Sequence, residues 1–390
     1  MEKSKFIPYG RQDITEEDIK AVVKILRSDF LTQGPTVPIF ERKLCDYTGA
    51  KYTVAVNSCT SALHIACLSL GLGDGDILWT SPITFVASAN CALYCGASID
   101  FVDIEPNTAL MSIEKLEEKL KQAEKEGALP KIIIPVHFAG QPCDMQEIYA
   151  LSQKYGFKII EDAAHAIGSK YQNESVGNCR YSDITVFSFH PVKIITTGEG
   201  GAAMTNNPLL FEKMNLLRSH GITRDLANMK KVPDGSWYYE QVDLGFNYRM
   251  TDIHAALGIS QMSRIDRYVS SRAKISKWYD EQLKDLALEP LIQKSDRNSA
   301  YHLYVVRVTG DEKERKKLYN HMYESGIGVN VHYMPVYQQV YYNYSDVFNE
   351  AEMYYQRAIS LPIFPSITDS ELNIVKENIL NYFDLNFVVK

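Results

Sequence analysis

Residues 188–201 read SFHPVKIITTGEGG, and this stretch connects two segments that have the composition of buried strands. The pattern predicts one strand at Ile184–Ser188 and the next at Gly201–Thr205. Lys193 lies between them and is flanked by Val192, Ile194 and Ile195. A lysine forms a Schiff base only as the neutral amine, and apolar flanks disfavour the ammonium form. Lys193 is therefore a candidate for covalent amine chemistry, although most lysines are solvated surface charges.

A second candidate lies about thirty residues upstream. Lys158–Glu161 reads as a buried strand that is followed by Asp162 and then by His165. A carboxylate at the C-terminal end of such a strand faces the crevice where open α/β sheets bind ligands. Pyridoxal phosphate (PLP) needs a carboxylate there to keep its pyridine nitrogen protonated. The alternative is that Asp162 caps a helix that begins near Ala163. Together with Lys193, the cofactor interpretation is favoured.

A third motif predicts a phosphate site. The apolar strand Thr53–Val56 leads into small and hydroxylic residues and then into a helix that continues to about Leu70. Hydroxyl and free N–H groups at a helix N-terminus bind phosphate, although an ordinary Ser/Thr N-cap has the same pattern. Ser188 could supply another hydroxyl, and Phe85 could stack on a flat ring, although a buried phenylalanine is more often part of a core.

Strand and helix patterns alternate along most of the chain. The remaining strands are predicted at Asp76–Thr80, Ser98–Val102 and Lys131–Pro135, with helices at Ile113–Glu126 and Met145–Lys154 among those between them. This alternation predicts an α/β fold whose mostly parallel sheet is covered on both faces.

The last third of the chain predicts a smaller α+β domain. A long amphipathic run from Thr251 to about Leu286 is followed by a strand at Tyr301–Val308, a helix at Glu312–Ser325 and a strand at Val329–Tyr333. We predict a large domain over residues 1–255, with an N-terminal arm, and a smaller domain over residues 256–390. The loop at 225–240 is expected to be mobile.

Composition narrows the functional classes. The 390 residues are 45% hydrophobic, enough for a large core in two domains, and the formal charge of −7 argues against nucleic acid or an anionic membrane as a partner. No apolar run approaches the roughly 18 residues of a membrane span, and the first residues form no apolar signal segment. We therefore expect a cytoplasmic protein.

The cysteine and glycine patterns argue against a metal site and against a dinucleotide-binding motif. The seven cysteines are scattered, and we expect reduced thiols and no metal site, with Cys91 and Cys95 as a core pair. Gly71, Gly73 and Gly75 follow a helix instead of preceding one, which indicates a helix stop and not a dinucleotide fingerprint. His137 ends an apolar strand and is expected to be a satisfied core or site-wall residue, and Asp144 is expected to cap a helix.

With these motifs, the chain resembles the DegT/StrS-type nucleotide-sugar aminotransferases, a branch of the fold-type I PLP enzymes. The resemblance covers nearly the whole chain. Besides the segments above, it is carried by the segments Pro8–Gln12, Leu31–Pro35, Arg218–Gly221, Gly245–Asp252 and Val331–Tyr337. It implies a seven-stranded, mostly parallel sheet in the large domain. Within the family, the chain is most similar to the branch of pseudaminic acid biosynthesis.

The resemblance also implies roles for individual residues. Lys193 would bind the cofactor covalently and move the proton, Asp162 would pair with the pyridine nitrogen, and His165 would lie near the ring oxygen. Phe85 would stack on the ring. The phosphate would be held by Cys59, Thr60, Ser61 and Ser188, and by Asn247 of the second subunit of a homodimer; Cys59 departs from the small residue expected there, which leaves a backbone N–H intact. The implied substrate-binding residues are Tyr9, Asp29, Phe30, Leu31, Thr32, Ser188, Asn247, Arg249, Asn330, Val331, His332 and Tyr333.

The implied reaction is transamination with L-glutamate as the donor and a UDP-linked 4-keto-6-deoxy-N-acetylhexosamine of the L-arabino type as the acceptor. The alternatives are the D-configured epimer, a 3-keto sugar, a PLP-dependent sugar dehydratase and a catalytically silent family member. Dehydratase relatives carry histidine at the Schiff-base position, so Lys193 argues against that activity, and a silent member should have lost Lys193 or Asp162. A nicotinamide dehydrogenase is excluded by the missing fingerprint.

Overall fold

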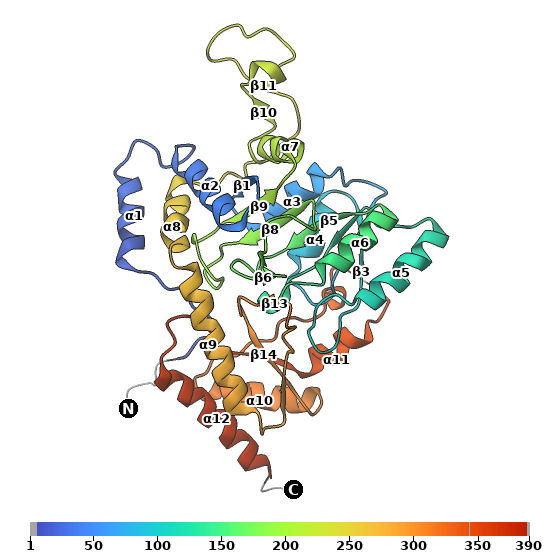
Figure 1. Ribbon diagram of the computed structural model, residues 1–390, viewed down its shortest axis with the longest axis vertical. Coiled ribbons are helices and arrows are strands. Elements are labelled where there is room, and N and C mark those ends of the chain that lie inside the picture. Colours follow the sequence, from blue (N-terminus) through green and yellow to red (C-terminus); the bar gives the residue numbers. More distant parts are fainter. Residues whose placement is uncertain (1–5, 343, 388–390) are drawn as a thin grey trace.

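A computed structural model of the chain describes residues 6–342 and 344–387. Its centre is a seven-stranded sheet with the strand order β1-β9-β8-β5-β4-β2-β3 (Figure 1). β9 is antiparallel to both of its neighbours, and all other neighbouring strands are parallel. The strands are β1 (Tyr52–Val56), β2 (Ile77–Thr80), β3 (Ser98–Phe101), β4 (Ile132–Ile134), β5 (Lys158–Asp162), β8 (Ile184–Ser188) and β9 (Gly201–Thr205). The predicted mostly parallel sheet is confirmed, with every strand end within one residue of its predicted position.

Helices cover both faces of this sheet because both sides of its strands are apolar. On β8, Val186 packs into one core cluster and the next residue, Phe187, into the opposite one, as the alternation of side chains along a strand requires. One face is covered by α3 (Cys59–Ser69), α4 (Ala87–Tyr94) and α7 (Pro208–Arg218). The other is covered by α2 (Thr36–Thr48), α5 (Ile113–Glu126), α6 (Met145–Tyr155) and α8 (Asp252–Met262).

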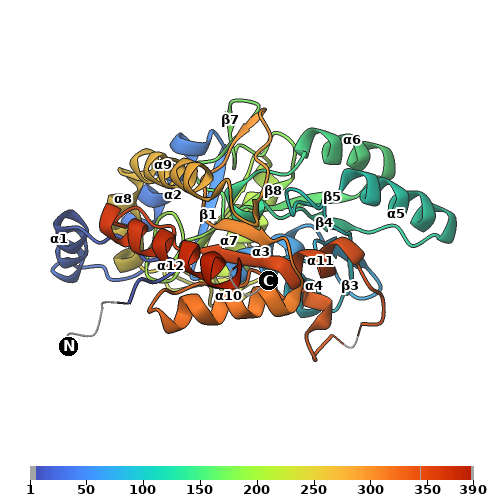
Figure 2. The ribbon, with the colours of Figure 1, turned by 90° about the horizontal axis from the view of Figure 1, so that it is seen from below.

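A second, three-stranded antiparallel sheet forms the C-terminal part of the fold (Figure 2). It consists of β12 (Leu288–Pro290), β14 (Tyr304–Val308) and β15 (Ala358–Leu361). Its core also contains side chains of α9 (Ile265–Leu283), α10 (Glu312–Glu324) and α12 (Asp369–Phe387), and α11 (Asn349–Arg357) packs nearby. The predicted domain boundary at 255/256 falls inside α8, and the division into two domains stays a prediction.

One predicted element of this part was wrong and another is divided. The amphipathic run from Thr251 to about Leu286 forms two helices, because the chain breaks at Ser263 and Arg264 between α8 and α9. The guanidinium of Arg264 pairs there with Asp18 of α1 (Glu16–Leu26) at 2.6 Å, a tertiary contact that holds the break. Residues 329–333 form no strand, since a single bridge between Asn330 and Ser360 is present and the segment turns along a cavity wall.

Smaller elements complete the chain. β6 (Lys170–Tyr171), β7 (Glu174–Ser175) and β13 (Arg297–Asn298) form a third small sheet, and η1 (Phe138–Gly140) and η3 (Val336–Gln338) are single turns. The hairpin of β10 (Ile222–Thr223) and β11 (Glu240–Gln241), with η2 (Leu226–Asn228) between them, stands away from the body (Figure 1). The mobility expected for residues 225–240 stays a prediction. Across the described ranges, no helix is both long and apolar enough for a membrane span.

Candidate active site

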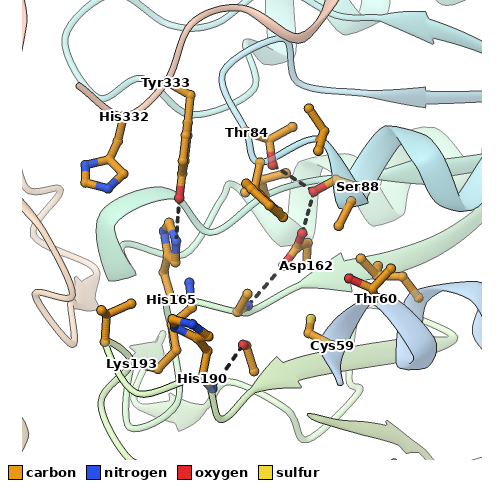
Figure 3. A pocket seen from close by; sticks show the side chains of 18 of the residues that line it. Cys59, Thr60, Thr84, Ser88, Asp162, His165, His190, Lys193, His332 and Tyr333 are labelled. Atoms are coloured by element: carbon orange, nitrogen blue, oxygen red, sulfur yellow. Dashed lines mark hydrogen bonds between the residues drawn. The ribbon is translucent and has the colours of Figure 1, made fainter. Parts of the chain in front are cut away.

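A cavity of about 660 Å³ lies at the C-terminal ends of β5 and β8, next to the first turn of α3 (Figure 3). Open α/β sheets bind ligands at this edge. Asp162 and Ser188, at the ends of the two strands, both line the cavity, and so does Lys193. Residues 330–334 of the C-terminal part close another side. The structure therefore brings the two residues that the sequence singled out, Lys193 and Asp162, into one cavity.

Lys193 lies on the loop that connects β8 to β9. Backbone hydrogen bonds fold this loop: Phe189 N–H donates to Gly200 O at 2.9 Å, and Lys193 N–H donates to His190 O at 2.9 Å. Ile194 and Ile195, the next two residues, are buried and anchor it. Burial lowers the pKa of the Lys193 amine to about 8, against the smaller opposing effects of Cys59 and Asp162. A larger fraction of the amine is therefore neutral near physiological pH than in an exposed lysine, which favours nucleophilic chemistry.

Asp162 is held by two hydrogen bonds. Ser88 Oγ donates to Oδ2 at 2.6 Å, and the Ala164 N–H donates to Oδ1 at 3.0 Å. Residues after Asp162 form turns and no helix, so the alternative interpretation of Asp162 as a helix cap was wrong. The carboxylate is 5% exposed and lines the cavity, an arrangement that suits a buried cationic partner.

His165 lies between this carboxylate region and the C-terminal segment. Its Nε2 is 3.3 Å from the Tyr333 hydroxyl (Figure 3). Its ring centroid is 4.3 Å from that of His302. Burial is the main cause that holds the pKa of His165 well below its ordinary value, and the nearby Lys193 lowers it further. The imidazole is therefore neutral. Its Nδ1 is buried and has no hydrogen-bond partner in the described part of the chain.

The first turn of α3 forms the opposite wall. Ser58 is the N-cap, and its Oγ accepts a hydrogen bond from Ser61 N–H at 3.1 Å. Cys59 and Thr60 line the cavity, and the first N–H groups of a helix have no partner within the helix. A Cβ added to Gly201 of β9 would lie 2.5 Å from Cys59 N, so glycine is needed for this close approach of strand and helix.

Ser61 lies outside the cavity wall. Its Oγ donates to Asn57 Oδ1 at 2.7 Å and lies 3.0 Å from Ser58 Oγ. Both its N–H and its hydroxyl are thus used in the N-cap network. The structure gives no support to Ser61 as a direct phosphate ligand.

The cavity fits pyridoxal phosphate. Through Cys59 and Thr60, the N-terminus of α3 lies at the cavity wall, and a helix N-terminus favours anions such as phosphate. The Nδ1 of His165, which has no partner among the described residues, can donate to a ring oxygen. The Phe85 side chain, 59% exposed, lies at the wall and can cover a flat ring.

Several predicted substrate-binding residues also line the cavity. The Tyr9 ring centroid lies 5.3 Å from that of His332, and a hydrogen bond of 2.8 Å joins His332 Nδ1 and Ser360 Oγ. Burial and then Lys193 lower the pKa of His332 to about 3, so this imidazole is neutral. The predicted residues in this wall are Tyr9, Asn330, Val331, His332 and Tyr333.

Other predicted residues do not reach the cavity of their own chain: Asp29, Phe30, Leu31, Thr32, Asn247 and Arg249. Asp252, at the start of α8, fixes the first segment because it accepts the N–H groups of Gly34 at 2.8 Å and Thr36 at 2.7 Å. Arg249 donates to Ser219 Oγ at 3.3 Å. Tyr248, which the sequence grouped with Asn247 and Arg249, instead contacts His64 of α3 in its own chain at 3.1 Å.

Sequence reasoning missed several cavity residues. The most informative are Thr84 and Ser88, whose hydroxyls lie 2.7 Å apart at the start of α4. Their i, i+4 spacing across a helix start indicates that the two hydroxyls can meet each other. The spacing does not indicate that Ser88 also contacts Asp162. The other cavity residues that were not singled out include Val86, Ala87, His190, Glu199, Met334 and Gln339.

The remaining polar candidates are structural. His137 is buried, with Nε2 2.7 Å from Glu161 Oε2 and Nδ1 accepting from Cys143 N–H at 3.1 Å, so it is satisfied as predicted. Asp144 precedes α6, but its side chain pairs with Lys294 and Arg297 and does not cap the helix. Within residues 6–342 and 344–387, no cluster of His, Cys, Asp and Glu has an arrangement that could hold a metal ion.

Comparisons with known proteins agree with this site. A model of the DegT/DnrJ/EryC1/StrS aminotransferase family matches residues 12–380. The spore coat polysaccharide biosynthesis protein SpsC of Bacillus subtilis is 37% identical over 387 residues, 96% of each chain. The UDP-4-amino-4,6-dideoxy-N-acetyl-beta-L-altrosamine transaminase of Campylobacter jejuni is 36% identical over 384 residues, 97% of this chain and 98% of the relative.

Solved structures extend the likeness to the fold. The Helicobacter pylori aminotransferase PseC, involved in pseudaminic acid biosynthesis, matches with a TM-score of 0.89 and 31% identity over 97% of this chain and 100% of its own. The sugar aminotransferase Spr1654 of Streptococcus pneumoniae matches in its PLP form with a TM-score of 0.87 and 31% identity, covering 97% of this chain and 99% of its own. The same enzyme also matches in its pyridoxamine phosphate form.

Proposed function

The chain belongs to the DegT/DnrJ/EryC1/StrS aminotransferase family of PLP-dependent enzymes, and we propose that it aminates C4 of a UDP-linked 4-keto-6-deoxy-N-acetylhexosamine. L-Glutamate is the proposed amino donor, the acceptor has the L-arabino configuration, and the 4-amino sugar nucleotide is made for pseudaminic acid biosynthesis. The observation that carries the transaminase chemistry is the presence of Lys193 and Asp162 in one cavity. The substrate rests on the likeness to the Campylobacter transaminase and to PseC.

Lys193 is the proposed attachment point and proton carrier. The bound cofactor supplies an electron sink that makes the Cα–H of an attached amino acid acidic. The neutral Nζ of Lys193, favoured by burial, takes the proton from Cα of glutamate and delivers a proton to C4 of the sugar. Delivery from the side on which Lys193 lies sets the configuration of the new amine.

Other cavity residues orient the cofactor in this proposal. Asp162 pairs with the pyridine nitrogen and keeps it protonated, and His165 donates to the ring oxygen through Nδ1, which has no partner in the described part of the chain. Phe85 covers the ring. Cys59 and Thr60 hold the phosphate through the helix N-terminus, together with the hydroxyl of Ser188.

A homodimer with shared active sites is part of the proposal. Asn247 lies outside the cavity of its own chain, and, as the family resemblance implies, it would reach the phosphate of the partner's cofactor. Phe30 and Leu31 are 53% and 47% exposed, and exposed apolar residues of this size favour an interface. The segment Asp29–Thr32 and Arg249 would then contribute to the substrate site across that interface.

The wall of Tyr9, Asn330, Val331, His332 and Tyr333 is the proposed sugar-nucleotide side of the cavity. Tyrosine hydroxyls can donate to diphosphate oxygens, and their rings can pack on uracil. Such a wall suits more than one UDP sugar, and SpsC is as similar to this chain as the Campylobacter transaminase is. The alternative acceptors are therefore the D-configured 4-keto epimer and a 3-keto sugar.

A competition experiment tests the substrate. Purified enzyme with glutamate is offered both UDP-4-keto epimers at equal concentration, and the products are identified by NMR. A higher kcat/KM for the L-arabino epimer supports the proposal. Preference for the D-epimer, a 3-keto sugar or a dTDP sugar would overturn the substrate and leave the transaminase chemistry in place.

A further inference from the structure

We propose that Ser88, supported by Thr84, is a positioning residue that sets the orientation of Asp162 toward the cofactor ring. The inference rests on the role proposed above for Asp162 and is independent of the sugar acceptor. It gives a role to two hydroxyls that the sequence did not single out.

The three side chains form a continuous hydrogen-bonded chain (Figure 3). Thr84 Oγ1 lies 2.7 Å from Ser88 Oγ, and Ser88 Oγ lies 2.6 Å from Asp162 Oδ2. All three residues are buried, with exposed fractions of 3%, 1% and 5%. A short hydrogen bond to a buried carboxylate constrains the side chain strongly.

The donor and acceptor of each hydrogen bond in this series follow from the chemistry of the three groups. An ionised carboxylate has no proton to donate, so the Ser88 hydroxyl donates to Asp162. Ser88 Oγ then has only acceptor capacity left for Thr84, and the Thr84 hydroxyl must donate to it. Each donor polarises the next, so the contact on Asp162 is stronger than that of an isolated serine.

The hydrogen-bond partner of Ser88 is unusual for a serine in a helix. A serine inside a helix usually points to solvent or bonds the carbonyl oxygen one turn back. Ser88 is the second residue of α4, yet its hydroxyl reaches a carboxylate 74 positions away on β5. The bond satisfies no backbone group of α4, whereas it holds Oδ2 of Asp162.

The hydrogen-bonded series also connects two proposed cofactor contacts. Thr84 immediately precedes Phe85, the residue proposed to cover the ring, and Asp162 is proposed to contact the ring nitrogen. The Ala164 N–H holds the other oxygen of the carboxylate at 3.0 Å. With both oxygens held, the carboxylate cannot rotate, so its plane is set relative to the ring before the cofactor binds.

The test is Ser88→Ala, measured by titrating the apo-protein with pyridoxal phosphate and by single-turnover rates of the holoenzyme with glutamate alone. We expect about tenfold weaker cofactor binding and about a tenfold slower glutamate reaction, the effect of one lost hydrogen bond to a charged group. Ser88→Thr keeps the hydroxyl and should recover most of both. Thr84→Val should show a smaller change of the same kind.

Ser69→Ala is the matched control. Ser69 is a buried serine of α3 whose hydroxyl donates to Ala66 O at 2.8 Å, away from the cavity. It should leave cofactor affinity and rate unchanged. If Ser88→Ala failed to fold by circular dichroism, Thr84→Val would carry the test, because removal of the Thr84 donor weakens the same chain.

A double-mutant comparison separates positioning from general packing. Because Ser88 is proposed to act through Asp162, Ser88→Ala should change cofactor affinity much less in an Asp162→Asn background than in the wild type. The same loss in both backgrounds, or wild-type affinity and rate for Ser88→Ala alone, would overturn the proposal. Cofactor titration and the glutamate reaction need no sugar, so failure of the proposed acceptor would not affect this outcome.

Discussion

The hydroxyl of Tyr333 lies 3.3 Å from Nε2 of His165, so the segment before η3 contacts the end of the seven-stranded sheet directly. Burial raises the pKa of Tyr333, which therefore keeps its proton. Burial and the nearby Lys193 keep His165 neutral. We propose that the hydroxyl donates to Nε2, which places the ring proton on Nδ1, the nitrogen that has no partner among the described residues.

Tyr333→Phe should therefore slow transamination. The variant loses the hydroxyl that fixes this tautomer, and we expect the rate with glutamate to fall about tenfold. Thermal unfolding should change little, since the phenylalanine ring keeps the packing against Phe138. Tyr337→Phe removes a hydroxyl that bonds Glu352 at 2.6 Å outside the cavity, and it should keep full activity. A full rate for Tyr333→Phe would contradict the proposed tautomer control.

Attachment of the cofactor to the apo-protein should accelerate with rising pH. A lysine whose pKa is lowered to about 8 is protonated below that value and neutral above it, and only the neutral amine attacks the aldehyde. Stopped-flow absorbance should give an association rate that rises with pH and levels off above about 8. Nα-acetyl-lysine, with an ordinary pKa of about 10.4, is the reference and should still accelerate above pH 9. An identical pH profile for the two amines would contradict the lowered pKa.

Asp162→Asn should slow turnover by roughly a hundredfold or more, while cofactor affinity falls less. An amide holds the position but does not keep the pyridine nitrogen protonated. Steady-state kinetics with glutamate and an apo-protein titration measure the two effects separately. Asp144→Asn is the control, because Asp144 pairs with Lys294 and Arg297 away from the cavity. Near wild-type turnover of Asp162→Asn would remove Asp162 from the chemistry.

Mixing two inactive variants tests the shared site. Lys193→Ala and Asn247→Ala subunits should each be inactive, and a hybrid dimer should contain one site with both residues intact. Part of the activity should return after subunit exchange, measured by the turnover of the mixture. No recovery after exchange has been verified, with Asn247→Ala inactive alone, would contradict a site built from two chains.

Much of the fold was predictable because its signals are local. The strands of the large sheet are short apolar runs bounded by turn residues, and their ends were predicted within one residue. Lys193 and Asp162 were predictable for the same reason, since each follows a strand whose C-terminal end must face the crevice.

The rest depends on contacts between distant segments. The break at Arg264 is held by Asp18, which is 246 positions away, and no local pattern predicts it. The link from Ser88 to Asp162, 74 positions apart, likewise appears only when folding brings the start of α4 to the C-terminal end of β5. One ambiguity is local: the N-cap network that joins Ser61 to Ser58 and Asn57 has the same sequence pattern as a phosphate site.

Lys193 is the residue proposed to bind the cofactor, and chemical trapping tests this role most directly. The holoenzyme is reduced with sodium borohydride, digested and analysed by mass spectrometry. The pyridoxyl mass should be found on the peptide that contains Lys193, and Lys193→Ala should carry no such label and no turnover while its circular dichroism stays that of the wild type. A label on another lysine, or full transamination by Lys193→Ala, would contradict the account.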